Sequence, residues 1–208
     1  RAVSILEKLT ELTKTAEKRG AELVVWPESA YPYTIPHSMR FGARGPRALL
    51  QPGVRGPVLS GVYMTGGHGM SYNSAVIAWA DGTLSDPYDK RHLLWFGETV
   101  PLADEIPWLR KAFHRGTGLQ PGEAQVVLAH GKMRAGILNC YEDTIGLAGR
   151  QAQEGANLLV NVTNDGWFVG SAESELHLRL SVMRSIEVRR DMVRAVNLGP
   201  TSWVDASG

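Results

Sequence analysis

Apolar positions in the first part of the chain recur with the spacing of a helix. Within residues 2–19 they fall at i, i+4, i+7 and i+11, on one predicted face: Ile5, Leu9, Leu12 and Ala16. Gly20 then suits the end of the helix, because glycine readily adopts the left-handed backbone found there. The apolar stretch 22–26 predicts a short buried strand, which Pro27 ends because proline cannot donate to a strand ladder.

The middle of the chain alternates between irregular and strand-like stretches. Residues 31–57 hold several prolines and glycines without a clear period, so we expect a loop there. Residues 58–65 and 73–80 are apolar, β-branched or aromatic enough to form strands. The dipeptide Asp81-Gly82 predicts a hairpin turn into a further strand at 83–88.

Strands and helices alternate in the second half of the chain, after an irregular stretch in which residues 107–113 suit a short helix. The expected elements are a hairpin of strands 125–129 and 133–139, a helix at 142–154, a strand at 157–162, a long helix at 173–191 and a strand at 193–198. This alternation, with antiparallel hairpins inserted, predicts an α/β layered domain with a mixed sheet.

The composition is that of an ordinary globular domain and excludes several classes of function. The 208 residues carry a net charge of +1, so no nucleic-acid partner is expected. A single cysteine rules out an internal disulfide and a site of several thiolates, and no metal or other cofactor is expected. No apolar run approaches the roughly 20 residues of a membrane span. Because the chain opens at Arg1, we interpret it as an internal fragment of a longer protein.

Three of the predicted strands end abruptly in residues that could do chemistry. Glu28 follows the first strand, Lys90 follows the hairpin strand, and Cys140 lies between a buried strand and the start of a helix. Sites in α/β sheets gather at such carboxyl ends of strands. Each residue also has an interpretation without catalysis. Glu28 also fits a solvated loop carboxylate, Lys90 a solvated basic turn and Cys140 a small buried core residue.

Taken together, the three residues suit acyl transfer through a cysteine. The thiol needs a carboxylate to take its proton, and the tetrahedral intermediate needs a cation and a backbone N–H beside its oxyanion. A helix that starts just after Cys140 would also favour the thiolate. A Cys–His pair is the main alternative catalytic arrangement. Its candidate histidines are not placed as clearly at the end of a predicted strand: His92, His130 and His177. No Gly-x-Ser-x-Gly elbow is present.

In this order, the three segments resemble the nitrilase or carbon–nitrogen hydrolase superfamily, whose members use a Glu-Lys-Cys triad in an αββα sandwich. The matching stretches are WPES (26–29), YDKRHL (88–93) and NCYED (139–143). The resemblance implies that Glu28 is the base, Lys90 the oxyanion stabiliser and Cys140 the nucleophile. It also implies that residues 1–208 form one α/β domain with mixed sheets, without the first strand, the last strands and any transmembrane part of the parent protein.

Details within the superfamily resemble its apolipoprotein N-acyltransferase branch. YDKRHLLWFGETVPL (88–102), CYED (140–143) and residues 161–208 are similar to motifs of that branch, and the Arg-x-Pro-Glu more usual after the cysteine of soluble nitrilases is absent. By position, this resemblance implies supporting carboxylates and residues that border or line the pocket: Glu98, Glu142, Tyr141, Asn73 and Trp167. Glu98 is expected to orient Lys90 and keep it charged.

Two departures from the branch concern its lipid-facing arm. Trp95 stands where a smaller or proline-containing segment is expected, and the loop between Pro101 and Gly118 is shorter than is typical. The apolar residues of this region suit a lipid-facing flap, and ordinary packing explains them about as well. They are Leu93, Leu94, Trp95, Phe96, Ile106, Trp108, Leu109 and Phe113.

The branch resemblance also implies the substrates and the location of the protein. A fatty acyl group would move from a phospholipid to the N-terminal diacylglyceryl-cysteine of an apolipoprotein, through a thioester on Cys140. The parent protein would be a monomer in the bacterial inner membrane, with this domain on the periplasmic side. Two alternatives use the same fold: a soluble nitrilase-like amidase, and an inactive interaction domain, against which the retained triad argues.

Overall fold

Two five-stranded sheets form the centre of the molecule. The computed structural model describes residues 2–102, 105–112 and 118–208. The first sheet has the order β1 (Val24–Trp26), β3 (Val58–Thr65), β4 (Ser71–Ala78) and β5 (Tyr88–Asp89), with β2 (Thr34–Pro36) also pairing with β3. The second has the order β10 (Ser202–Val204), β9 (Met192–Asn197), β8 (Leu158–Asn164), β7 (Met133–Asn139) and β6 (Val127–His130).

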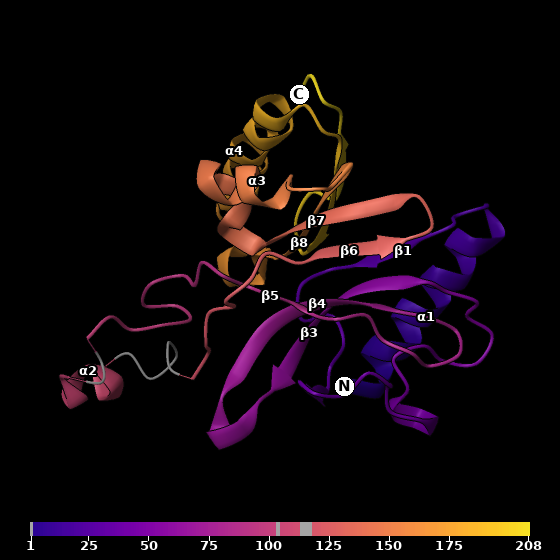
Figure 1. The fold of residues 1–208 in the computed structure, drawn as a ribbon, viewed down its shortest axis with the longest axis horizontal. Helices are drawn as coiled ribbons and strands as arrows, with labels where there is room; N and C mark the ends of the chain where they lie inside the picture. Colours follow the sequence, from indigo (N-terminus) through magenta and orange to yellow (C-terminus); the bar gives the residue numbers. More distant parts are fainter. Residues whose placement is uncertain (1, 103–104, 113–117) are drawn as a thin grey trace.

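Helices cover the outer face of each sheet, so the layers run helix, sheet, sheet, helix. Helix α1 (Ala2–Lys18) lies against the first sheet, whereas α3 (Gly146–Ala152) and α4 (Glu173–Val188) lie against the second (Figure 1). Among the described helices, none is long and apolar enough to cross a bilayer. The predicted αββα sandwich with mixed sheets is confirmed.

Alternation along the strands divides the apolar residues among three cores. In β3, Val58 and Val62 pack with Leu6 of α1, whereas Leu59 points into the space between the sheets. Ile137 and Val160 meet Leu59 from the second sheet. Their neighbours Leu138 and Leu159 face the outer helices instead. Because successive strand residues point to opposite faces, near-continuous apolar strands are what a sheet buried on both sides requires.

The parallel pairs place several strand ends at one edge of the sandwich. Strands β7, β8 and β9 run parallel, as do β1 and β3, whereas the hairpin pairs are antiparallel. The carboxyl ends of β1, β7 and β8 therefore deliver the residues that follow them to the same region, as expected for α/β sheets.

The buried face of α1 differs from the predicted one. Leu6, Thr10 and Thr13 are buried, whereas Ile5 and Leu12 are exposed. The threonine hydroxyls donate to backbone carbonyls four residues earlier, which satisfies their polar atoms inside the protein. Thr13 also accepts a hydrogen bond of 2.9 Å from the indole of Trp26.

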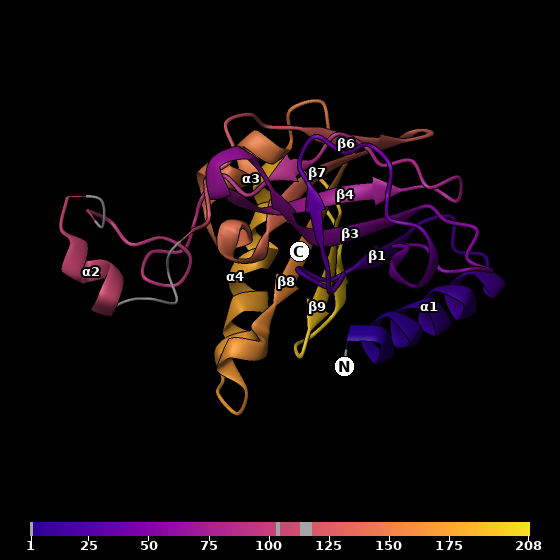
Figure 2. The same ribbon diagram turned by 90° about the horizontal axis from the view of Figure 1, so that it is seen from below.

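Other elements differ from prediction in their extent. The helix expected at 142–154 is split into the 3-10 segment η4 (Cys140–Thr144) and α3, and the short strands β2 and β10 were not predicted. The short helix near 107–113 is present as α2 (Pro107–Ala112), which lies away from the sheets in both views (Figures 1 and 2). Phe113, expected in the lipid-facing flap, lies outside the described residues.

Gly136 is the position where β7 approaches the end of α3 most closely. A Cβ built there would collide with the backbone carbonyl of Ala152, and would lie 3.1 Å from the Cβ of Ala156. We expect Gly136→Ala to lower the free energy of unfolding by about 1–3 kcal/mol, because a packed backbone must move. Thermal unfolding measures this. Gly67→Ala is the matched control, since nothing lies within 4 Å of its added Cβ; equal melting temperatures for the two variants would contradict the packing.

Candidate active site

The three predicted catalytic residues line one cavity at the strand-end edge. Glu28, Lys90 and Cys140 all border a cavity of about 480 Å³. Its other walls include Glu98 and a set of apolar or aromatic side chains: Tyr63, Leu94, Phe96, Leu119, Trp167 and Phe168. The structure therefore brings together residues that lie more than 100 positions apart in the sequence, from both sheets.

Glu28 follows β1 and is held against β3. A Cβ built on Gly61 of β3 would lie 2.5 Å from the Cα of Glu28, so only glycine lets the segment carrying Glu28 pack this closely. Ser29, the next residue, has a left-handed backbone with φ 52°. This turn directs the Glu28 side chain into the cavity rather than into solvent, where a loop carboxylate would ordinarily lie.

Three groups contact the buried carboxylate of Glu28. The amide of Asn73 donates to Oε1 at 2.6 Å, the backbone N–H of Asn164 donates to Oε2 at 3.0 Å, and the ammonium of Lys90 lies 3.8 Å from Oε1. Burial raises the pKa of Glu28 above its ordinary value, although Lys90 and Asn73 act in the opposite direction. A carboxylate with a raised pKa is a better proton acceptor.

Lys90 is buried as an ammonium between two carboxylates. Its side chain is 1% exposed and its Nζ lies 2.7 Å and 2.9 Å from the two oxygens of Glu98. The ring of Tyr141 lies 5.4 Å from Nζ, within cation–π range. Burial alone would lower the pKa of Lys90, but Glu28, Cys140 and Glu98 outweigh it and raise the pKa. Lys90 is therefore a fixed positive charge at the cavity.

Cys140 sits at the junction of β7 and η4 in a left-handed backbone with φ 53°. Its carbonyl accepts a hydrogen bond of 3.0 Å from the side chain of Asn161 on β8, which fixes the turn. Burial and the charge of Glu28 raise the pKa of the thiol, and Lys90 opposes them. Cys140 begins the five-residue 3-10 segment η4, and α3 begins only at Gly146, so the α-helix that we expected to start just after Cys140 starts later. The resting group is a thiol that needs a base.

Glu142 ties the Lys90 segment to the Cys140 segment. It is fully buried and accepts hydrogen bonds of 2.7–2.9 Å from the hydroxyl of Tyr88 and from the backbone N–H groups of Arg91, His92 and Asn139. It does not line the cavity. Its contacts fit the supporting position that the sequence predicts for it.

The remaining predicted residues fall in different places. Trp167 lines the cavity and is 66% exposed, whereas Asn73 is 1% exposed and lies behind the carboxylates, where its amide donates to Glu28 and, at 3.0 Å, to Glu98. Tyr141 donates its hydroxyl to the carbonyl of Leu93 at 3.1 Å. Asn73 is therefore placed to orient the carboxylates rather than to touch a substrate in the cavity.

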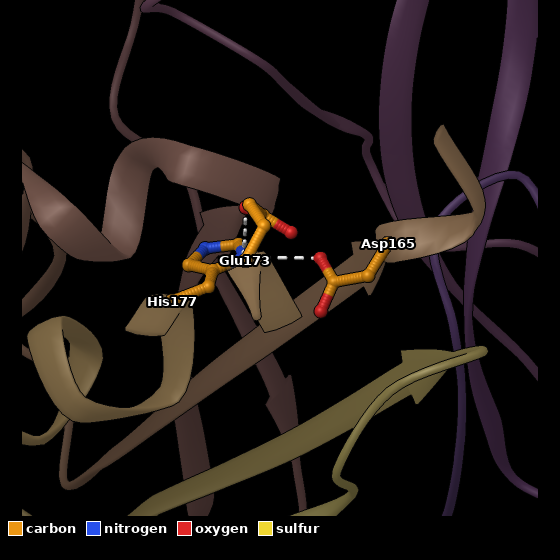
Figure 3. Close-up of side chains that lie close together, drawn as sticks. All are labelled: Asp165, Glu173 and His177. Carbon is orange, nitrogen blue, oxygen red and sulfur yellow. Dashed lines mark hydrogen bonds and ion pairs between the residues drawn. The ribbon is translucent and has the colours of Figure 1, made fainter. Parts of the chain in front are cut away.

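Sequence reasoning missed Asn161, Asn164 and the cluster around His177. The two asparagines lie on β8, where each looks like an ordinary strand residue. His177, considered above only as a partner for Cys140, instead contacts Asp143 and Asp165. Asp165, Glu173 and His177 have ligand-type atoms within 4.8 Å of one another (Figure 3). Both ring nitrogens of His177 already face carboxylates, however, which leaves no free lone pair for a metal ion.

Solved structures of similar fold include members of the nitrilase superfamily. An amidase from Nesterenkonia sp. superposes with a TM-score of 0.68 at 19% identity, over all of this chain and 78% of that chain. A carbon–nitrogen hydrolase from Helicobacter pylori superposes with a TM-score of 0.70 at 17% identity, over 96% of this chain and 70% of that chain. At these identities the likeness establishes the class of fold, a nitrilase-type sandwich.

The sequence comparison establishes the family. The profile described as carbon-nitrogen hydrolase matches residues 3–207, so the chain belongs to the carbon–nitrogen hydrolase family. Two similar relatives are named apolipoprotein N-acyltransferase, from Geobacter metallireducens and Bdellovibrio bacteriovorus. Each is 35% identical over 99% and 98% of this chain respectively. The chain spans about 40% of the length of each of these relatives.

Because the two charged residues beside the Cys140 thiol have opposite charges, replacing each should change the reactivity of the thiol in opposite directions. Glu28 raises the thiol pKa and Lys90 lowers it. At a fixed pH below that pKa, Glu28→Gln should therefore speed alkylation of Cys140 by iodoacetamide, and Lys90→Met should slow it, by about tenfold for each unit that the pKa moves. Rates between pH 7 and 10, followed by mass spectrometry of the Cys140 peptide, measure both effects.

Ser185→Ala serves as the control for this alkylation series, because Ser185 is fully buried on α4 and does not line the cavity. It should leave the rate unchanged. If Glu28→Gln slowed alkylation while Lys90→Met accelerated it, the described charge arrangement around the thiol would be wrong.

Proposed function

We propose that this domain is the acyl-transfer centre of an apolipoprotein N-acyltransferase. The observation that carries the proposal is the cavity in which a buried carboxylate, a buried ammonium and the only cysteine of the chain meet. Glu28 is the base, Lys90 stabilises the oxyanion and Cys140 carries the acyl group. The names of the similar relatives support the choice of reaction, and the lipid donor and the thioester are part of the proposal.

In the first half-reaction, Glu28 takes the proton of the Cys140 thiol. The sulfur attacks the sn-1 ester carbonyl of a phospholipid, and the tetrahedral oxyanion is held by the Lys90 ammonium and a backbone N–H near Tyr141. The carbon–oxygen bond of the ester then breaks, and Glu28 returns its proton to the leaving oxygen. The products are a lysophospholipid and an acyl thioester on Cys140.

In the second half-reaction, the α-amine of a diacylglyceryl-cysteine lipoprotein attacks the thioester carbonyl. Glu28 takes a proton from the attacking nitrogen, the carbon–sulfur bond breaks, and the proton passes to the departing sulfur of Cys140. The lipoprotein leaves as an N-acyl amide. Glu98, Asn73 and Glu142 keep Lys90 and Glu28 in place through both steps.

Aromatic side chains at the cavity support a lipid donor over a small polar amide. Phe96 is 51% exposed and Trp167 66%, and Phe168 beside them is 43% exposed. Trp95, next to Phe96 in the chain, is 69% exposed. Apolar surface that stays in water around a cavity favours a ligand with apolar chains. We further propose that the parent protein acts as a monomer in the bacterial inner membrane, with this domain on the periplasmic side.

Substitution of Cys140 tests the proposed function in the full-length protein. With a phospholipid labelled in its sn-1 acyl chain and a diacylglyceryl lipopeptide, Cys140→Ala should lower the rate of label transfer by at least about a thousandfold, as loss of a nucleophile does. Ser185→Ala removes one buried oxygen on α4, away from the cavity, and should transfer label at the unsubstituted rate. Transfer by Cys140→Ala at the control rate would overturn the proposal.

The same variants separate the acyltransferase from a nitrilase-like amidase. An amidase would use the triad to release ammonia from a primary amide, with water resolving the thioester. We expect the full-length protein to release no ammonia from a fatty acid amide while it transfers label to the lipopeptide. Cys140-dependent ammonia release without label transfer would establish the amidase instead.

A further inference from the structure

A buried histidine bridges two turns of the candidate site. The ring of His177, on α4, donates from Nε2 to Asp143 at 2.8 Å and from Nδ1 to Asp165 at 3.0 Å. His177 is 5% exposed, and the two aspartates are 0% and 1% exposed. Figure 3 shows the ring directed at Asp165, with Glu173 beside it at 3.8 Å from Nδ1.

The two aspartates belong to the segments that deliver the reacting groups. Asp143 lies in η4, the turn that begins with Cys140. Asp165 begins η5 (Asp165–Phe168), directly after Asn164, whose N–H holds Glu28, and ahead of Trp167 and Phe168 at the cavity. One side chain on α4 thus spans the segment of the thiol and the segment that holds its base.

The charges around the ring stabilise the bridge. Burial alone would lower the pKa of His177, but its hydrogen bonds to Asp143 and Asp165 raise the pKa to about 9. The ring is therefore an imidazolium at neutral pH. Arg194 on β9 donates to the second oxygen of Asp143 at 3.0 Å, and Glu173 lies on the other side of the ring. Opening the bridge would leave the buried imidazolium without its partners and Asp165 without its cation, which is costly, whereas Asp143 would keep Arg194.

A metal ion or a Cys–His pair explains the cluster less well. A metal at Asp165, Glu173 and His177 would need Nδ1 without its proton, whereas Nδ1 lies at hydrogen-bond distance from a carboxylate, and the Arg194 guanidinium lies nearby. A catalytic partner of Cys140 would need a ring nitrogen directed at the sulfur. Both nitrogens of His177 are directed at aspartates instead.

We propose that His177 is a positioning residue, which clamps the η4 turn of Cys140 to the η5 turn beside Glu28 so that thiol and base stay aligned. This inference rests on the proposed function of the site. It assigns His177 no contact with the substrate and no proton transfer. Its effect is on the geometry of the reacting pair, where a displacement of about 1 Å can lower a rate about a hundredfold.

The clamp is tested in the full-length protein by breaking it at either end. His177→Leu and Asp165→Leu should each lower kcat for label transfer by about a hundredfold and change KM by less than about threefold. The double variant should be no slower than either single one, because both remove the same bridge. Asp165→Asn keeps an oxygen that accepts from the ring, and should restore kcat to within about threefold of the unsubstituted protein.

The matched control is Arg184→Met, two helical turns further along α4. It removes a partly buried ion pair with Glu187, 3.0 Å long, that is separate from the hydrogen bonds of His177 to Asp143 and Asp165. It should lower the melting temperature without lowering kcat. If His177→Leu does not fold, the Asp165→Leu and Asp165→Asn pair decides the question alone.

Three outcomes would overturn the clamp. Unchanged kcat in folded His177→Leu or Asp165→Leu would do so, as would additive effects in the double variant. Loss of activity with a chelator, restored by Zn²⁺, would replace the clamp by a metal site. Label transfer at the full rate by Cys140→Ala would instead contradict the proposed function itself. The iodoacetamide rate at Cys140 would then still report the clamp, since misalignment from Glu28 should change it in His177→Leu and not in Asp165→Asn.

Discussion

The site depends on the burial of one positive charge, the ammonium of Lys90. An isolated ammonium is very costly to remove from water, so a lysine that is 1% exposed needs charged partners close by. Glu98 bonds it directly and Glu28 lies 3.8 Å away. Two carboxylates around one ammonium leave an excess negative charge, which the side-chain amide of Asn73 and the backbone N–H of Asn164 stabilise through hydrogen bonds to the carboxylates. The pKa of Glu28, and through it that of Cys140, follows from this arrangement.

The strands of the two sheets place these charged residues at one edge of the sandwich. β1 brings Glu28, the end of the first sheet brings Lys90, and the parallel strands β7 and β8 bring Cys140 and Asn164. Buried polar side chains then join these segments through hydrogen bonds. Glu142 joins the Lys90 segment to the Cys140 segment, and His177 joins the turns that follow β7 and β8. Glu28, Lys90 and Cys140 lie on the segments that follow strands, and the strands fix where those segments begin.

Much of this could be predicted from the sequence because strand ends are local signals. Apolar runs that stop at Pro27 and at Cys140 mark both the strands and the residues beyond them. The strand predicted at 83–88 was less well predicted, because it is present only as the two-residue β5 before Lys90. The buried face of α1 could not be predicted, because Thr10 and Thr13 count as polar until their hydroxyls find backbone carbonyls. His177 could not be assigned either. Its partners lie 34 and 12 residues away on different elements, and no periodicity relates them.

The mass of Cys140 during the reaction tests most directly whether this residue carries the acyl group. The full-length protein, incubated with phospholipid and no acceptor, should gain the mass of one acyl chain, mapped to the peptide that contains Cys140. Addition of a diacylglyceryl lipopeptide should remove that mass as the N-acyl product forms, and Glu28→Gln should accumulate none. Acyl transfer at the full rate with no adduct on Cys140, or with the adduct on another residue, would contradict the account.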